Sequence, residues 1–302
     1  MPTLYIHVGL HKTGTTSLQK TLHDNRPALR EQGILYPETG LSEKAANWGH
    51  HELAYALRHR GKARQFWTAM REEADAKALP KVMISSEEFA LLPFPTMPGA
   101  EPFKLIAEIF ASYEIQLICY LRPQAEMIES LYNHNVKSVG EQRGILDFMA
   151  QIAPRLEYQH YLNVAALGLG PQAIIVRRYQ KAHMKNGDIV SDIAELIGLD
   201  RGPLSLKTAE LNPGLTARGM AEMLEANRRH ADNPMRLQAA RSRILAKHRA
   251  PAFYRHELLS PETRQVIEAL YRAKNRQISR RFLKRDEDLF PVDPQPETAT
   301  AS

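Results

Sequence analysis

The sequence predicts a three-layer α/β protein, with a mostly parallel sheet flanked by helices and a helical C-terminal part. Through roughly the first 200 residues, short apolar runs rich in β-forming residues alternate with helical patterns, as is typical of a parallel sheet with helices on both faces. From about residue 216 to 282 the sequence favours helix alone, with interruptions near Asn233-Pro234 and Ala250-Pro251.

The first predicted unit is a strand, a loop and a helix. Residues 4–8 form a short apolar run suited to a strand, and residues 9–16 are rich in glycine and threonine. A helical pattern opens near Thr15 and continues to about Leu29. Strand, glycine-containing loop and helix are the start of an α/β unit.

The later elements follow in the same alternation. Residues 43–80 predict helix, and a strand at 81–85 ends in Ser86-Glu87-Glu88. A proline-rich loop covers 93–102, a helix about 103–112 and a strand 115–121, which leads into Arg122-Pro123 and a new helix. A strand at 173–176 precedes a helix at 190–197 with Gly198 as its C-cap.

Composition limits the classes of protein that are possible. The chain has 302 residues, 43% of them apolar, a net charge of +6 and one cysteine, Cys119, which excludes an internal disulfide. Cys119 lies in an apolar run and is interpreted as a buried structural thiol. With no signal peptide and no run of ~20 apolar residues, we expect a soluble cytoplasmic protein. We expect one domain, 1–290, and a disordered tail, 291–302.

The residues from His7 to Ser17 form a P-loop-like anion cradle. Gly9 and Gly14 have the separation of a nucleotide P-loop, but Thr15 stands where its lysine belongs, and the lysine, Lys12, comes earlier. Glycines let backbone N–H groups close on an anion at the positive end of a helix. Lysine adds a mobile charge, and hydroxyl donors follow at Thr13, Thr15, Thr16 and Ser17.

A lysine before the second glycine, followed by threonines, resembles the 5′-phosphosulfate loop of sulfotransferases. The resemblance implies a P-loop-like sulfotransferase domain that moves a sulfuryl group from 3′-phosphoadenosine 5′-phosphosulfate (PAPS) to a hydroxyl or amine, without a metal. It implies that the donor is bound by the loop residues His11, Lys12, Thr13, Gly14, Thr15, Thr16 and Ser17.

A second match to this family begins at the end of the strand 115–121. Sulfotransferases hold the 3′-phosphate with an arginine at a strand end and a serine eight residues later, and Arg122 and Ser130 have this spacing. Such an arginine faces the ligand crevice of an α/β sheet, and two helical turns bring the serine to the same face. The two strands after the loop lack the aspartate that holds magnesium in P-loop ATPases.

Weaker matches to the bacterial-type branch of the family occur at 176–179, 211–213 and 275–290. In relatives a basic C-terminal loop closes over the cofactor, which makes Arg280 and Arg281, with Lys284, candidate contacts. A solvated helix face explains the same charges.

An acceptor hydroxyl needs a general base, and the leaving phosphate needs a positive charge. Lys12 is the candidate for the charge. Some branches of the family use a histidine after the second strand and others a glutamate, so Glu87 is the first candidate base and Glu88 the second, on the expectation that neighbours at a strand end point to opposite sides. His51 is a rival, with His7, His11 and His50.

Two other functions fit parts of this pattern. A P-loop kinase would bind ATP and magnesium through a lysine at position 15, and a non-catalytic binder of adenosine bisphosphate or RNA would need no base. The sequence shows no RNA-binding pattern of interleaved aromatics. The acceptor is not identified, although the run 228–249, with seven Lys/Arg and one acid, fits an anionic one as well as a solvated helix.

Overall fold

The structure is a computed structural model that describes residues 1–42, 48–205, 214–250 and 257–291. Its centre is a parallel sheet with the strand order β2-β3-β1-β4-β5. The strands are β1 (Thr3–His7), β2 (Ile34–Leu35), β3 (Lys81–Ser85), β4 (Glu114–Leu121) and β5 (Ile174–Arg178). The predicted α/β fold class is confirmed. The short β2 was not predicted, and β5 runs two residues beyond its predicted end.

Because β1 lies in the middle of the sheet, the loop after β1 lies where the order in which strands are added changes direction. His7, the last residue of β1, pairs with Ser85 of β3 on one side and with Ile118 of β4 on the other. The chain first builds the side containing β2 and β3 and then crosses to build β4 and β5. Ligands of open α/β sheets bind in the crevice at the carboxyl ends of the strands at such a point.

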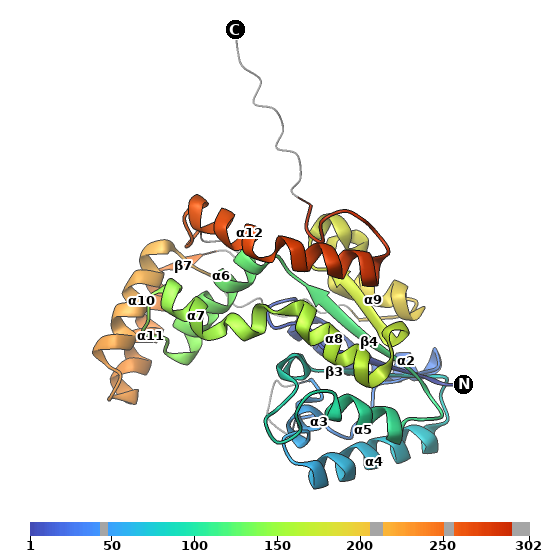
Figure 1. Cartoon of the computed structure of the whole chain (residues 1–302). Coiled ribbons are helices and arrows are strands. Elements are labelled where there is room, and N and C mark those ends of the chain that lie inside the picture. The colour runs from blue at the N-terminus through green and yellow to red at the C-terminus, as the bar shows by residue number, and fades with distance from the viewer. Residues whose placement is uncertain (43–47, 206–213, 251–256, 292–302) are drawn as a thin grey trace.

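Helices cover both faces of the sheet (Figure 1). Alternate residues of β1 point to opposite faces of the sheet. Leu4 and Ile6 belong to one buried cluster, and Tyr5 packs against the other. The second cluster contains residues of α1 (Thr15–Asp24), α2 (Arg26–Glu31) and α9 (Ile189–Ile197). The first contains residues of α3 (His51–Ala56), α4 (Arg60–Lys77), α5 (Glu101–Ile109), α6 (Gln124–His134), α7 (Ile145–Leu156) and α8 (Tyr158–Leu169).

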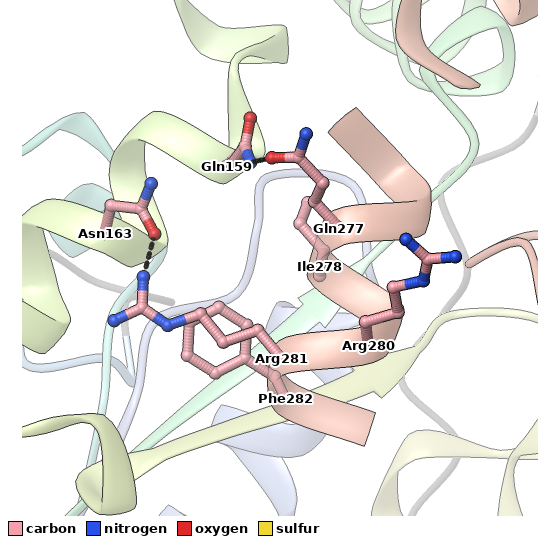
Figure 2. A pocket seen from close by; sticks show the side chains of 7 residues that line it. All are labelled: Gln159, Asn163, Gln277, Ile278, Arg280, Arg281 and Phe282. Carbon is pink, nitrogen blue, oxygen red and sulfur yellow. Dashed lines mark hydrogen bonds between the residues drawn. The ribbon is translucent and has the colours of Figure 1, made fainter. Parts of the chain in front are cut away.

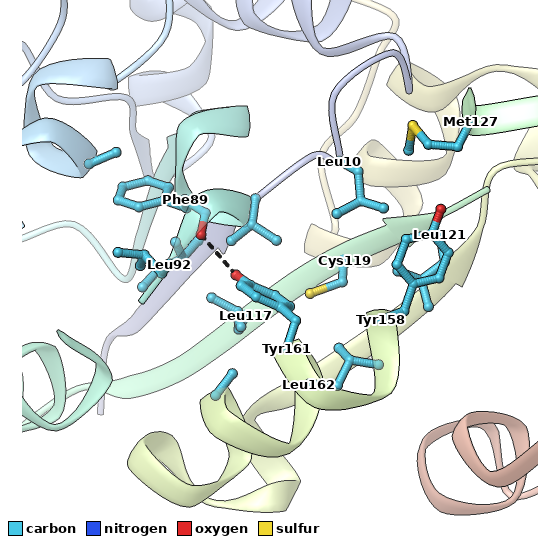
Figure 3. Close-up of a cluster of buried hydrophobic side chains, with 14 of the residues drawn as sticks. Leu10, Phe89, Leu92, Leu117, Cys119, Leu121, Met127, Tyr158, Tyr161 and Leu162 are labelled. Carbon is cyan, nitrogen blue, oxygen red and sulfur yellow. Dashed lines mark hydrogen bonds between the residues drawn. The ribbon is translucent and has the colours of Figure 1, made fainter. Parts of the chain in front are cut away.

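The layer between β4 and α8 is a dense apolar core (Figure 3). Cys119 is fully buried there, and burial raises the pKa of its thiol. Nearby, the Tyr161 hydroxyl donates to the Phe89 carbonyl oxygen at 3.2 Å, so the one polar atom of that buried ring is satisfied. The interpretation of Cys119 as a structural thiol is confirmed.

The C-terminal part is helical, as predicted, and three side chains cap its helices. Thr216, Asn233 and Ser260 each accept a hydrogen bond from a backbone N–H in the first turn of α10 (Ala217–Arg229), α11 (Pro234–Lys247) and α12 (Pro261–Ile278), respectively. Figure 1 shows α10 and α11 side by side at one end of the molecule. A small antiparallel pair, β6 (Gly214–Leu215) and β7 (Arg249–Ala250), was not predicted.

Some predicted elements differ in their bounds. The helix expected from Thr15 to Leu29 divides at Asn25, because Pro27 begins a new helix. The long helix expected at 43–80 is two helices, α3 and α4, and residues 43–47 lie outside the described residues, as do 211–213 and 292–302. Shorter helical turns are η1 (Glu87–Leu91), η2 (Asn135–Val139), η3 (Pro171–Ala173), η4 (Lys181–His183), η5 (Lys185–Gly187) and η6 (Ser279–Leu283).

Candidate active site

The loop between β1 and α1 has a backbone shaped to enclose an anion. Gly9, Lys12 and Gly14 have φ angles of 83°, 63° and 75°, so left-handed residues alternate with ordinary ones along the loop. Such alternation turns successive N–H groups toward one point. Two backbone bonds with Tyr120 fix the loop to β4: its N–H donates to the Gly9 oxygen at 2.7 Å, and its oxygen accepts from the Leu10 N–H at 3.2 Å.

Helix α1 begins directly after this loop and has no side-chain cap. Its first intrahelical bond runs from the Leu18 N–H to the Gly14 oxygen at 3.2 Å. The N–H groups of Thr15, Thr16 and Ser17 therefore have no acceptor within the helix. N–H groups without an acceptor at the positive end of a helix dipole are able to bind an anion such as a phosphate or sulfate group.

The threonines of the loop have different surroundings. Thr13 is fully buried, and its hydroxyl donates to the Leu10 carbonyl oxygen at 2.6 Å. Thr15 is also buried, whereas Thr16 is exposed and Ser17 partly exposed. The Thr13 hydroxyl therefore holds the loop itself together in this structure, and the hydroxyls of Thr16 and Ser17 reach the surface.

Lys12 lies among other cations. Its side chain reaches solvent, yet partial desolvation lowers its pKa, Lys137 and Arg122 lower it further, and Glu87 opposes them. Burial, and then the charges of Lys12 and Lys137, lower the pKa of His134 to about 4. Lys12, Arg122 and Lys137 form a group that we call the basic cluster. Concentrated positive charge of this kind raises the local concentration of anions.

Sequence reasoning did not identify Lys137, although a signal was present. Lys137 lies seven residues beyond Ser130, and residues seven apart share one face of a continuous helix. In the structure α6 passes without a break into the π-helical turn η2, which carries Lys137. Extending the predicted Arg122 and Ser130 stripe by two more turns would have found it.

Arg122 supports the loop directly. Its Nη1 donates to the Lys12 carbonyl oxygen at 3.2 Å, and its Nε donates to Glu126 Oε2 at 3.2 Å. The guanidinium carbon lies 6.0 Å from the centre of the Tyr179 ring. Arg122 thus stands at the carboxyl end of β4, as predicted, and Ser130 lies two turns along α6. Their role with a 3′-phosphate stays a prediction.

Both candidate glutamates approach the loop, in contrast to the expected opposite directions. The strand ends at Ser85, and Ser86 caps a 3₁₀ helix by accepting from the Glu88 N–H at 3.2 Å. Glu87 and Glu88 therefore lie in the first turn of a helix, where neighbours differ by about 120° rather than 180°. Glu87 Oε2 accepts from Gln19 Nε2 at 2.8 Å, and Glu88 Oε1 lies 3.6 Å from His11 Nε2.

The environment of Glu88 makes its carboxylate a weak base. A hydrogen bond from His11 is the largest cause that lowers its pKa, burial opposes it, and the charges of His11, His51 and Arg155 lower it further. A carboxylate stabilised in its charged form has less tendency to accept a proton. Glu88 is therefore suited to hold His11 in the loop.

The two histidines near β3 form hydrogen bonds within the protein. His50 is fully buried, its Nδ1 accepts from the Ser85 N–H at 3.2 Å, and its Nε2 donates to the Pro37 oxygen at 3.1 Å. Both ring nitrogens are thereby used, and burial lowers the pKa of His50 to about 4. His51 Nδ1 lies 2.7 Å from the Ser86 hydroxyl, in a ring that is 6% exposed.

Arg280 and Arg281 line a separate pocket of about 410 Å³ between α8 and the end of α12 (Figure 2). Arg281 contacts Asn163 of α8, and Arg280 pairs with Asp286. The lining of this pocket includes no residue of the loop from His7 to Ser17. A contact of these arginines with the donor stays a prediction, and the structure does not bring them to the basic cluster.

A smaller pocket of about 20 Å³ adjoins the loop itself. Its lining is apolar apart from two basic side chains: Leu10, His11, Ala90, Leu91, Met127, Leu131 and Arg155. This volume accommodates about one water molecule or a small functional group.

Comparisons with known proteins add little to this geometry. No protein-family model matches the sequence, and no curated protein does. Among solved structures, a sulfotransferase from Alicyclobacillus acidocaldarius is similar at a TM-score of 0.43 and 16% identity, over 80% of this chain and 96% of that chain. Both the TM-score and the identity are low, so this likeness does not identify the function of the chain.

Within the described residues, no helix has both the length and the apolar composition needed to cross a membrane.

Proposed function

We propose that this chain is a sulfotransferase that uses PAPS as its donor. The observation that carries the proposal is the loop: an uncapped α1 N-terminus, Lys12 beside it in the basic cluster, and Glu87 close enough to influence the charge of Lys12. The donor set fits a phosphosulfate, because backbone N–H groups, hydroxyls and a lysine can all donate to its oxygens.

The residues divide the chemistry between them. The acceptor oxygen or nitrogen attacks sulfur, the bond from sulfur to the bridging phosphate oxygen breaks, and adenosine 3′,5′-bisphosphate leaves. Glu87 takes the proton of the acceptor, and Lys12 stabilises the negative charge that develops on the leaving oxygen. Arg122 and Ser130 would hold the 3′-phosphate at the carboxyl end of β4.

The residue at position 15 supports a sulfotransferase rather than a P-loop kinase. Thr15 stands where the kinase lysine would be, and it is buried at the first position of α1. The positive charge of the loop comes instead from Lys12, two residues before Gly14. A donor whose leaving group is stabilised by that lysine is a better match than ATP with magnesium.

The test is a screen of glycans, glycolipids and small alcohols with radiolabelled PAPS, followed by single-turnover transfer. We expect Glu87→Gln to lower the rate of transfer by ~10²–10⁴-fold, because it retains the shape of the side chain and loses the proton acceptor. Binding of the bisphosphate should change little. Full turnover in Glu87→Gln, with loss in Glu88→Gln or His51→Ala, would show that another residue is the base.

A further inference from the structure

A chain of polar side chains runs through the buried space between β1, β3 and α1 and ends at Glu87. His7 Nδ1 lies 2.8 Å from the Ser85 hydroxyl, and Gln19 Nε2 donates to that hydroxyl at 3.3 Å and to Glu87 Oε2 at 2.8 Å. His7 and Ser85 are fully buried, and Gln19 is 3% exposed. Polar groups so buried form a fixed arrangement, because each lost bond leaves an unsatisfied atom.

The charge of Glu87 determines the direction of every bond in this chain. An ionised carboxylate only accepts hydrogen bonds, so Gln19 must turn its NH₂ group toward Glu87. The second hydrogen of the same NH₂ group goes to the Ser85 oxygen, and the Ser85 hydroxyl hydrogen is then directed at His7 Nδ1. Because burial lowers the pKa of His7 to about 3, the ring is neutral and can accept it.

We infer that Gln19 is a positioning residue that fixes the Glu87 carboxylate for proton transfer, an inference that rests on the proposed role of Glu87 as the base. Gln19 lies one turn after Thr15, so the helix that presents its N-terminus to the donor also carries the amide that holds the base. Movement of α1 would therefore move donor and base together.

Gly49 shows how closely the surroundings fit the Gln19 amide. A Cβ at position 49 would lie 2.8 Å from Gln19 Nε2 and 2.8 Å from His51 Nε2, closer than side chains approach one another. The backbone at Gly49 thus lies close against the Gln19 amide, which leaves the amide little space to move on that side.

A double-mutant cycle tests the inference. Gln19→Met retains the length of the side chain and removes its donors, and we expect the rate of single-turnover transfer to fall ~10–100-fold, as small misplacements of catalytic groups do. In the Glu87→Gln background the same change should cost less than about twofold, because there is no base left to position. Equal losses in both backgrounds would overturn the inference.

Gln124→Met is the matched control. Gln124 is a buried glutamine that pairs with Asn275, between α6 and α12, and does not contact Glu87. We expect its variant to lose stability comparably to Gln19→Met and to retain the rate of transfer. An equal loss of transfer in Gln124→Met would show that burial alone explains the effect and would overturn the positioning role.

A second measurement does not depend on activity. The side-chain amide of Gln19 gives a ¹H–¹⁵N NMR signal, which we expect to shift in Glu87→Gln because the charged acceptor is lost. An unchanged signal would show that the contact is absent, which overturns the inference. A shifted signal in a protein that neither binds the bisphosphate nor transfers sulfate would support the contact and count against the proposed function instead.

Discussion

Lys12 combines an unusual backbone with an unusual electrostatic position. A left-handed φ of 63° costs a residue with a side chain roughly 1–2 kcal/mol, and Lys12 is held there by the loop around it. Its ammonium group is destabilised by desolvation and by Lys137 and Arg122, so its pKa lies below the ordinary value. A bound phosphate would offset the repulsion from Lys137 and Arg122, because it supplies a negative charge beside Lys12.

Anion affinity should therefore depend on pH through Lys12. As pH rises through the lowered pKa, the ammonium loses its charge, and we expect the affinity for adenosine 3′,5′-bisphosphate to fall about tenfold, the worth of one charge-assisted hydrogen bond. Calorimetric titrations between about pH 7 and pH 10 measure this change in affinity. The charged and titratable groups that face Lys12 are Lys137, whose pKa burial also lowers, together with Arg122, Glu87 and His134.

Lys12→Arg is the control, because arginine stays charged throughout this range. We expect the pH dependence to weaken in this variant and to vanish in the double variant Lys12→Arg, Lys137→Arg. The same slope in wild type and Lys12→Arg would show that Lys12 does not contact the anion.

For single residues, the sequence could predict where the loop lies but not which distant side chains contact one another. The spacing of Gly9, Lys12 and Gly14 is local, and the loop lies where that spacing predicts. Gln19 and Glu87 are 68 residues apart, and no pattern in the sequence joins them. The contact forms because β1 and β3 are neighbours in the sheet, and that order becomes visible only in the fold.

Helix α1 carries both the anion-binding N-terminus and Gln19, and its start depends on Gly14. With a φ of 75°, this position disfavours side chains, and a Cβ would lie 3.1 Å from the Tyr179 hydroxyl and 3.1 Å from Ile189. Glycine here lets the chain enter the helix while its N–H groups face outward.

Gly14→Ala should therefore destabilise the protein by roughly 1–2 kcal/mol, the cost of a side chain in left-handed conformation, and should weaken bisphosphate binding. Urea unfolding and calorimetry measure the two effects. Gly61→Ala is the control: Gly61 lies in α4 with nothing within 4 Å of a Cβ, so alanine should stabilise by about 0.5–1 kcal/mol. A Gly14→Ala protein as stable as wild type would contradict this role.

Element boundaries show why some sequence predictions were less accurate. The end of β3 and the start of α6 were predicted from the sequence, but the 3₁₀ turn at Glu87 and the π-helical turn at Lys137 were not. The turn at Glu87 does carry a local signal, because Ser86 caps it by accepting from the Glu88 N–H two residues later, as serine commonly does at the start of a helix. These turns decide which way the candidate catalytic side chains face.

The whole molecule buries two neutral histidines near the site, and this makes its stability sensitive to acid. Burial lowers the pKa of His7 to about 3 and that of His50 to about 4, against ~6.5 in an unfolded chain. The unfolded state binds protons at these histidines more readily than the folded state does. The stability that the two neutral histidines contribute is therefore fully present above about pH 6.5 and is lost as pH falls toward 4.

At pH 5 each of these histidines should reduce the free energy of unfolding by about 2 kcal/mol relative to pH 7.5. Urea unfolding at the two pH values measures the loss. His50→Gln should reduce the loss by about 2 kcal/mol, whereas His59→Gln, at an exposed position, should leave it unchanged. Equal stability at both pH values would show that His7 and His50 are not buried in neutral form.

We expect the loop to bind a phosphosulfate donor and not ATP with magnesium. Calorimetric titration with adenosine 3′,5′-bisphosphate in the presence of a chelator tests it most directly, beside a titration with ATP and magnesium. We expect the bisphosphate to bind without metal and Lys12→Ala to weaken it. Binding of ATP with magnesium, and none of the bisphosphate, would contradict the account.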